Sequence, residues 1–422
     1  MRTIRASRTR TFGLGITALA TVAALGACSS TTASSDDSPS SSACPTVPGV
    51  TASTITIGAV FPKSGAAAAT FTGFDTAAKL RFDQENAAGG INGRTIVVSS
   101  YDDQASGAQQ TVVANKMTQQ DSVFGVVAAS VTDTMYPMLK EKGIPVAGLG
   151  NLPPYTADPN AFGAYGPYAP GFGNTSGPQR MADAGATKIA VLNHVSPAAE
   201  SSADAFADSV PSVGGEVVLR KADLPLGSYD ATSTALLIKK SGADGVYEVV
   251  LPEGGVAIGQ AMKQQGLDPA AVYIPAMTDP EVIKQAAGPL EGVISSGYGT
   301  VPVTLDAPAV KGYFDGMTAG GLSPYLPLAP VGFLSADILV KGLQAAGPCP
   351  TREAVISALR AVTDYDGGGM LPGPVSFAPG LVPNGTPSNC TWFVTIHDGV
   401  GVPDEQATCG ETIDLTTGKA VS

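Results

Sequence analysis

The feature of this sequence that most constrains its fold is the repeated alternation of short β-branched runs with longer amphipathic runs. The run TITIGAVF at 54–61 is typical of a buried strand, and apolar residues at helical spacing follow it up to the pair Gly89-Gly90. The same order recurs from 94–103 onward. Strands that alternate with helices form parallel sheets with helices on both faces. The alternation therefore predicts an α/β fold.

The pattern breaks and then restarts, which predicts two lobes. Residues 151–173 are rich in proline, glycine and aromatic residues, and the alternation resumes at 187–194. One hydrophobic core stops growing near roughly 250–300 residues, so a chain of 422 residues with 44% apolar residues needs more than one. From Leu305 the pattern is mainly helical, and these helices have no strands of their own to cover. We expect them to return to the first lobe.

Residues 1–27 have the layout of an export signal. Residues 1–10 carry four arginines and no acidic residue, and residues 11–27 carry no charge. The uncharged run could also be a membrane-spanning helix, but its length is at the lower limit of the roughly 17–25 residues that cross a bilayer. Its alanine and glycine content weakens that alternative further.

The segment LGAC at 25–28 resembles the bacterial lipobox, in which the cysteine after small residues is lipidated. Cys28 would then be the mature N-terminus, followed by a serine-rich, flexible tether. The net charge of −12 disfavours nucleic acid as a partner, because phosphates repel an acidic chain. We therefore expect acyl chains such as palmitate on Cys28, rather than a basic patch, to anchor this lipoprotein on the outer face of the cell membrane.

Four cysteines remain besides Cys28, an even number in an exported, oxidising context. Three pairings are possible. Cys390 and Cys409 bracket a short segment with a hairpin pattern, so we favour a disulfide between them and a second between Cys44 and Cys349. A zinc site is the alternative, but there is no C-x-x-C motif and both histidines stand alone. We expect no metal.

Several segments, in order, resemble the extracytoplasmic solute-binding proteins of ABC importers, of the branched-chain amino-acid-binding type. The resemblance covers residues 50–400 and rests on ITIGAVFPKSG, DQENAAGGINGRTIVVSSYDDQAS, VFGVVAASVTDTMYPMLKEKGIPV, ATKIAVLNH and LEGVISSGY. It implies the type I periplasmic binding protein fold, with two doubly wound α/β lobes and a central ligand cleft. It also implies three crossovers, near 172, 300 and 386, about which the lobes close as a hinge.

The resemblance further implies a division of the chain and a set of partners. The partners are a small-molecule ligand and ABC permease subunits, with no cofactor, and the protein is expected to be a monomer. The expected parts are a signal peptide at 1–27, a lipid-anchored tether at 28–47, an N-terminal lobe at 48–172 plus 301–385, and a C-terminal lobe at 173–300 plus 386–415.

Candidate ligand-binding residues of the first lobe follow the carboxyl ends of the expected strands, where parallel sheets bind ligands. The family holds an anionic ligand group after the third strand, which corresponds to Ala129, Ser130 and Thr132 here. The alternative is that the two hydroxyls cap the next helix. The family closes the same wall at positions that correspond to Asn151 and Tyr155.

The second lobe departs from the amino-acid-binding pattern. Family members that bind amino acids carry a tyrosine after the strand that corresponds to 187–194, and this chain has none there. They also carry a carboxylate for the ligand ammonium after the strand that corresponds to 271–276, where this chain has Met277-Thr278 and Asp279 comes two positions late. Glu253 could substitute from a neighbouring loop. The solute is therefore either an amino acid or another small carboxylate, amide or more apolar molecule.

Five further side chains have competing interpretations. Phe71 matches an aromatic ligand wall of the family, but its helical spacing favours the core. His194 ends an expected strand and could be a ligand or a base, although a lone histidine there is more often structural. His397 lies beside a turn and is expected to be exposed. Asp102 and Asp103 point to opposite faces of a strand, so we expect helix capping rather than acid–base chemistry.

The sequence favours binding over catalysis. The common nucleophile, zincin and phosphate-loop signatures are absent from it, so a hydrolase that uses His194 with Glu253 has little support. We expect a protein that binds a small solute and delivers it to an ABC permease by hinge closure. The alternative is a ligand-sensing receptor subunit of a membrane signalling system.

Overall fold

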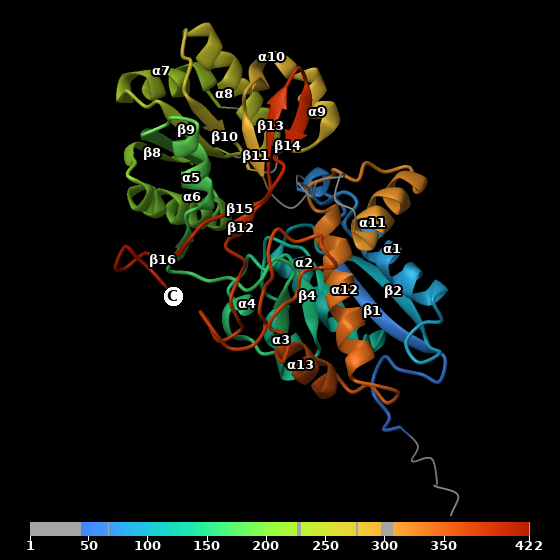
Figure 1. Ribbon diagram of the computed structural model, residues 1–422. Helices are drawn as coiled ribbons and strands as arrows, with labels where there is room; N and C mark the ends of the chain where they lie inside the picture. Colours follow the sequence, from blue (N-terminus) through green and yellow to red (C-terminus); the bar gives the residue numbers. More distant parts are fainter. Residues whose placement is uncertain (1–43, 66, 226–228, 276, 297–306, 422) are drawn as a thin grey trace, which may run out of the picture. The chain divides into compact units, whose positions relative to one another are not determined.

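The computed structural model contains two main sheets, each with its own helices (Figure 1). We call the five-stranded sheet and the helices packed on it the first lobe, and the seven-stranded sheet with its helices the second lobe. The expected export signal, Cys28 and the crossover near 300 lie outside the described residues. Those residues are 44–65, 67–225, 229–275, 277–296 and 307–421.

The first sheet has the strand order β2-β1-β3-β4-β5, and all its neighbours are parallel. β1 occupies the residues expected for it. The segment 151–173, which interrupts the alternation in the sequence, contributes β5. The sequence does not reveal this strand, because three residues are too few to show a periodic pattern. The strands are β1 (Thr54–Phe61), β2 (Thr95–Asp102), β3 (Gly125–Ala128), β4 (Val146–Gly148) and β5 (Ala161–Gly163).

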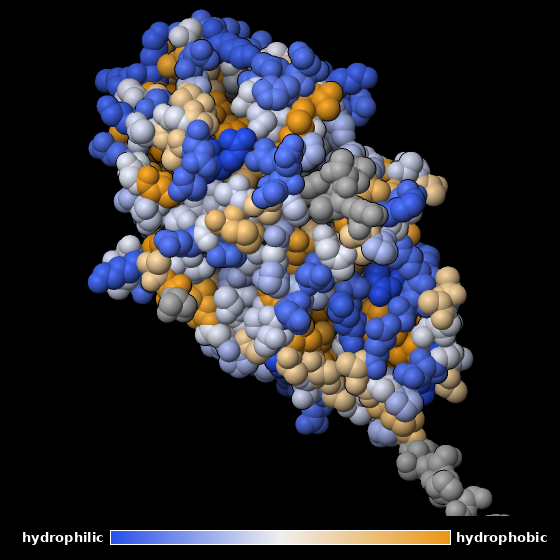
Figure 2. Space-filling view, viewed as in Figure 1, coloured by the Kyte–Doolittle hydropathy of each residue, from blue (hydrophilic) through white to orange (hydrophobic). Residues whose placement is uncertain are grey.

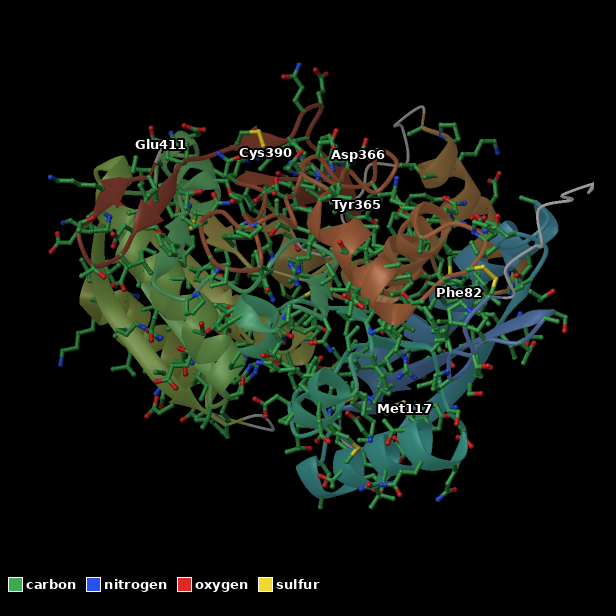
Figure 3. All side chains as sticks on the ribbon, turned by 90° about the horizontal axis from the view of Figure 1, so that it is seen from below. Phe82, Met117, Tyr365, Asp366, Cys390 and Glu411 are labelled. Atoms are coloured by element: carbon green, nitrogen blue, oxygen red, sulfur yellow. A yellow bond between two sulfur atoms is a disulfide. The ribbon has the colours of Figure 1, made fainter. Side chains whose placement is uncertain are left out.

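Apolar cores cover both faces of the first sheet. Side chains alternate along β1, so Ile57 packs into one cluster and Val60 into the other. Figure 3 labels one further member of each cluster, Phe82 and Met117. The helices in this part of the chain are η1 (Ala68–Phe71), α1 (Phe74–Ala87), α2 (Gly107–Asn115), η2 (Lys116–Gln120), α3 (Tyr136–Glu141) and α4 (Pro154–Ala157).

Three helices after residue 306 pack on the first lobe, as expected. They are α11 (Pro308–Ala319), α12 (Ala329–Ala345) and α13 (Arg352–Arg360).

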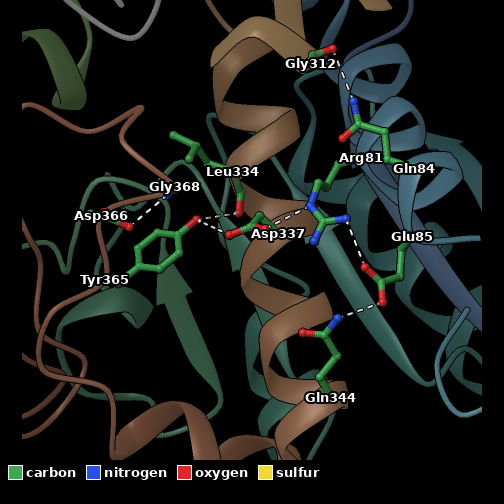
Figure 4. Close-up of polar contacts among 10 residues, drawn as sticks. All are labelled: Arg81, Gln84, Glu85, Gly312, Leu334, Asp337, Gln344, Tyr365, Asp366 and Gly368. Carbon is green, nitrogen blue, oxygen red and sulfur yellow. Dashed lines mark hydrogen bonds and ion pairs between the residues drawn. The ribbon is translucent and has the colours of Figure 1, made fainter. Parts of the chain in front are cut away.

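The backbones of α1 and α12 lie very close, because a Cβ on Gly332 would be 2.0 Å from the carbonyl oxygen of Phe74. Beside this contact, Arg81 Nε donates to Asp337 Oδ1 at 2.9 Å (Figure 4). The partly buried ion pair fixes the register of the two helices.

The second sheet repeats the first and then extends it. Its parallel part, β8-β7-β9-β10-β11, has the same relative order as the first sheet, and antiparallel β13 and β14 are added beside β11. The strands are β7 (Lys188–His194), β8 (Glu216–Leu224), β9 (Gly245–Val249), β10 (Ala271–Tyr273), β11 (Ile294–Ser296), β13 (Phe393–His397) and β14 (Val400–Pro403). The helices are α5 (Ser176–Asp183), α6 (Pro197–Ser209), η3 (Val210–Val213), α7 (Ala231–Ser241), α8 (Pro252–Gln264), α9 (Pro280–Gln285) and α10 (Ala287–Leu290).

Both expected disulfides are present. Cys44 is joined to Cys349, and Cys390, labelled in Figure 3, is joined to Cys409. The second bond links two directly paired strands, and the segment between its cysteines contains the expected hairpin, formed by β13 and β14. The short strands are β12 (Cys390–Thr391) with β15 (Thr408–Cys409), and β6 (Phe172–Asn174) with β16 (Thr412–Asp414) and β17 (Lys419–Ala420).

The described surface is mixed in polarity. On the face shown in Figure 2, apolar residues form small scattered patches among polar ones. In the described part of the chain, no helix has both the length and the apolar character needed to cross a bilayer. Two exposed apolar side chains, Val131 and Val195, stand out because each follows an interior strand of its sheet.

Candidate ligand-binding site

The strand orders create one topological switch point in each lobe. In a sheet of order 2-1-3-4-5, the chain leaves strands 1 and 3 toward opposite sides, and ligands bind beyond the carboxyl ends of these strands. The corresponding pairs are β1 with β3 in the first lobe and β7 with β9 in the second. We call residues 129–135, which follow β3, the β3 loop. Ala129, Ser130 and Thr132 therefore lie at a switch point, as their sequence position suggested.

The hydroxyl of Ser130 is fully engaged within the protein. Ser130 is 1% exposed. Its Oγ donates to Asp103 Oδ2 and accepts from Gln110 Nε2 at 3.2 Å and from the Thr132 backbone N–H at 3.3 Å. The helix α3 that follows begins after Met135, which makes no side-chain cap. Neither Ser130 nor Thr132 caps that helix.

The expectation that Asp102 and Asp103 cap a helix is wrong, because Ser106 is the N-cap of α2. The two aspartates do diverge, as alternation along a strand requires. Asp102 accepts from the backbone N–H of Lys63 at 2.8 Å. Asp103 instead accepts from the side chains of Ser130 and Gln110. Each aspartate also accepts from the backbone N–H two residues later, so local turns and tertiary contacts together set their roles.

In the loops that directly follow β3 and β4, two buried polar atoms have no hydrogen-bond partner among the described residues. They are Thr132 Oγ1 in the β3 loop and Asn151 Oδ1 just after β4. The two strands are neighbours, with Ala128 paired to Gly148, so the loops that carry these atoms start side by side. Buried polar atoms are nearly always hydrogen-bonded, and a bound solute is one way to supply the missing hydrogen bonds.

The remaining first-lobe candidates lie inside the protein. Phe71 is 4% exposed and belongs to an apolar cluster. Tyr155 is buried in α4, and its hydroxyl accepts from Tyr136 at 2.9 Å. Ala129 is also buried, and its N–H donates to the carbonyl of Val60 at 3.0 Å. All three residues therefore belong to the interior of the first lobe.

In the second lobe, His194 is the last residue of β7, as expected. Its ring Nδ1 is buried and has no partner among the described residues, and burial lowers its pKa. The next residue, Val195, is 59% exposed, and Val131 of the first lobe is 52% exposed. Each switch point thus combines an unpaired polar atom with an exposed apolar side chain. His397 is exposed, as expected, and lies 3.1 Å from Glu291 Oε1.

The acidic candidates of the second lobe differ in their surroundings. Glu253 is exposed in the first turn of α8, where a negative charge interacts favourably with the helix dipole. Asp279 is the N-cap of α9 and accepts from the backbone N–H of Glu281 at 2.8 Å. Thr278 is buried and donates to the carbonyl of Tyr325 at 3.2 Å. Only Glu253 presents an exposed carboxylate.

Sequence reasoning missed a buried carboxyl next to the second switch point. Glu248 lies in β9 and is completely buried, and its two oxygens have no partner among the described residues. Burial raises its pKa to about 8. The hydroxyl of Tyr229, also unpaired, is near enough for the Glu248 charge to raise its pKa further, beyond the larger effect of its own burial. The available signal was an acidic residue within the apolar run DGVYEVV.

Other parts of the described surface are less informative about function. Two hollows lie at α13 and at α11, outside the switch-point loops. No group of three or more metal-ligating side chains occurs in the described ranges.

Comparisons with known proteins agree with this architecture. Residues 54–400 match the family model described as periplasmic binding protein. A leucine-, isoleucine-, valine-, threonine-, and alanine-binding protein of Pseudomonas aeruginosa is 28% identical over 299 residues, which cover 68% of this chain and 76% of the relative.

Two solved structures show the same fold. A fatty acid ABC transporter substrate-binding protein from Thermomonospora curvata has a TM-score of 0.72 at 20% identity, covering 90% of this chain and 97% of that one. An R. palustris ABC transporter solute-binding protein in complex with benzoate has a TM-score of 0.67 at 18% identity, covering 84% and 96%. The strand orders and these likenesses establish the type I periplasmic binding protein fold. Because the family model spans most of the chain, the protein belongs to the periplasmic binding protein family.

Proposed function

We propose that this protein binds a small solute outside the cytoplasm and delivers it to an ABC permease. The observation that carries the proposal is the pair of switch points, each with an unpaired buried polar atom beside an exposed valine. Thr132 and Val131 supply these groups in the first lobe, and His194 and Val195 supply them in the second. Both lobes therefore provide groups that can bind the solute.

The chemistry of these groups suggests a solute with one apolar part and one polar end. The exposed valines contribute apolar surface, while the Thr132 hydroxyl and the backbone amides of the β3 loop can bind a carboxylate or an amide. The unpaired Asn151 Oδ1 can accept from an N–H of the solute. The relatives named above include an amino-acid binder, a fatty-acid transporter component and a benzoate complex. We therefore propose an amino acid or a related small carboxylate or amide.

From the second lobe, Glu253 is the proposed partner of a ligand ammonium, because its carboxylate is exposed at the switch point. Thr278 and Asp279 follow the adjacent strand β10 and are proposed to border the same wall. An ammonium without an anionic partner in a closed site is costly, so an amino-acid ligand requires a group of this kind.

The proposed mechanism is closure of the lobes on the solute. The moving bodies are residues 48–172 plus 301–385 and residues 173–300 plus 386–415. The solute must bind the closed form more tightly than the open form. This difference in affinity limits how far the solute can shift the equilibrium toward the closed form. The proposed acyl chains on Cys28 would keep the protein near the permease.

A thermal-shift and calorimetry panel of L-leucine, L-isoleucine, benzoate, 4-hydroxybenzoate and decanoate tests this function. At 100 times its dissociation constant, a ligand stabilises the folded state by about 2.7 kcal/mol, which is easily detected. We expect at least one probe to bind, and small-angle scattering to show a more compact protein with it. Failure of all five to bind would count against these solute classes.

Glu253→Gln separates the ligand classes. If leucine binds, this variant should weaken its affinity by about tenfold or more, since it removes the counter-charge of the ammonium. Benzoate affinity should not change. The matched control is Glu216→Gln, an exposed glutamate at the amino end of β8, which should alter neither.

Cys28→Ser tests the anchor. The variant should move from the membrane fraction to the supernatant after cell fractionation. Retention in the membrane fraction would contradict lipidation at Cys28.

A further inference from the structure

A buried network of hydrogen bonds lies directly behind the β3 loop. Its members are Asp103 after β2, Gln110 in α2 and Ser130 in the loop, and they are 0%, 0% and 1% exposed. Three separate chain segments thus meet through polar side chains in a region from which water is excluded. Hydrogen bonds in such surroundings are stronger than in water, and an unpaired member is correspondingly costly.

Gln110 contacts the β3 loop at several points. Its Nε2 donates to the carbonyl of Thr132 at 2.9 Å, and it lies 3.1 Å from Asp103 Oδ2 and 3.2 Å from Ser130 Oγ. Its Oε1 accepts from the backbone N–H of Met135 at 3.1 Å. One side chain therefore holds both the middle and the end of a loop that has no regular secondary structure.

An inventory of Ser130 shows that it has no hydrogen-bonding capacity left. A serine hydroxyl has one donor and two acceptor positions. The donor is used by Asp103, and the acceptors by the Thr132 N–H and by a Gln110 N–H that Ser130 shares with Asp103, since the Gln110 amide has two hydrogens for three acceptors. A solute could bind Ser130 only by displacing one of these buried partners.

The hydroxyl of Thr132 is in the opposite state. Its Oγ1 is buried but has no partner in the described part of the chain. The Thr132 backbone is held on both sides, by the carbonyl bond to Gln110 and the N–H bond to Ser130. The network thus fixes the position of this free hydroxyl without satisfying it.

We propose that Gln110, with Asp103 and Ser130, is a positioning residue that sets the conformation of the β3 loop, and that Thr132, not Ser130, makes the side-chain contact with the solute. This proposal rests on the function proposed above and assigns the roles within its first-lobe site. Gln110 acts through the loop and does not touch the solute.

The test compares Gln110→Met, Ser130→Ala and Thr132→Val, with Gln120→Met as the control, since Gln120 is an exposed glutamine beyond the network. Amide hydrogen exchange of the protein without solute measures how often the β3 loop opens. Calorimetry with L-leucine and benzoate measures binding. Methionine keeps the approximate length of glutamine but removes both its donor and its acceptor.

For Gln110→Met we expect exchange at Thr132 and Met135 to speed up by about tenfold or more, since local opening no longer breaks the bonds to Gln110. Probe affinity should fall by about tenfold or more. For Thr132→Val we expect a similar loss of affinity, with exchange unchanged. Ser130→Ala should change exchange and affinity together. The control should change neither.

Gln110→Glu adds a readout that a general loss of stability would not produce. At pH 8 the introduced carboxylate faces Asp103 and lacks the N–H donors, so binding of the probe should be weak. At pH 5 the introduced carboxyl is protonated and regains one donor, because the neighbouring carboxylate of Asp103 raises its pKa, and binding should recover. Wild-type protein should show no such recovery.

Three results would overturn the proposal. They are unchanged exchange in Gln110→Met, wild-type affinity in Thr132→Val, and weaker binding in Ser130→Ala without faster exchange, which would make Ser130 a contact. If neither probe binds wild-type protein, the proposed function fails for these two compounds. In that case unchanged exchange in Gln110→Met still overturns the positioning role, and faster exchange supports it.

Discussion

Asp103 in the first lobe and Glu248 in the second are both completely buried acidic residues near the carboxyl end of a strand, yet their surroundings differ. Asp103 accepts hydrogen bonds from Ser130, from Gln110 and from the backbone N–H of Ala105. The oxygens of Glu248 have no partner among the described residues, and burial raises its pKa to about 8.

The comparison shows that burial alone does not decide the state of a carboxyl group. The donors that tertiary packing brings to it decide whether it holds a loop or becomes neutral. In the first lobe the carboxylate organises the proposed binding loop. In the second lobe the carboxyl is a group whose charge would destabilise the fold.

The largest expected effect is the pH dependence that Glu248 gives to stability. Its folded pKa is raised from 4.5 to about 8, so its contribution to stability is fully present below pH 4.5 and is lost as the pH rises through 8. At about 1.4 kcal/mol per pKa unit, the loss is on the order of 5 kcal/mol.

Urea unfolding of wild-type protein and Glu248→Gln at pH 4.5 to 9 measures this effect. The difference between the two free energies of unfolding should change with pH, because the amide of the variant cannot ionise. A difference that stays constant across this range would mean that Glu248 has a partner.

A smaller effect is expected for Asp103→Asn. Hydrogen bonds to a charged group contribute roughly 1.5–3 kcal/mol, so removing the charge should lower the free energy of unfolding by about 2–3 kcal/mol. Chemical denaturation provides the measurement, with Asp208→Asn, at an exposed aspartate, as the control. A loss no greater than that of the control would remove the contrast between the lobes.

The smallest effects are expected at two buried tyrosine hydroxyls. That of Tyr136 has a hydrogen-bond partner, and that of Tyr229 has none among the described residues. Tyr136→Phe removes the 2.9 Å bond to Tyr155 and should cost about 1 kcal/mol. Tyr229→Phe removes a hydroxyl without a described partner and should leave stability unchanged or raise it by up to about 1 kcal/mol. Melting temperatures of the two variants provide the comparison. Equal losses would show that Tyr229 is hydrogen-bonded.

Much of the fold follows from local patterns in the sequence. The residues of β1 coincide with the run expected at 54–61, and α11 begins within the mainly helical stretch expected from Leu305. The preferred disulfide pairing is also confirmed, because a hairpin pattern singled out Cys390 and Cys409. β5 was missed, since three residues carry no period.

The candidate site was predictable only in part. The position of the β3 loop follows from the end of an apolar strand, and this part of the prediction agrees with the switch point. The role of Gln110 could not be anticipated, because it lies on a helix 22 residues before Thr132 in sequence. The unpaired state of Glu248 likewise depends on neighbours that packing supplies.

The sequence by itself determined the alternation of strands and helices, the two lobes that it implies and the acidic character of the chain. These properties depend on hydrophobic periodicity and composition, which act over a few residues. Tertiary structure alone decided which buried polar groups meet partners and which remain unpaired. The physical reason is that hydrogen bonds between distant segments depend on angstrom-scale distances that no local pattern encodes.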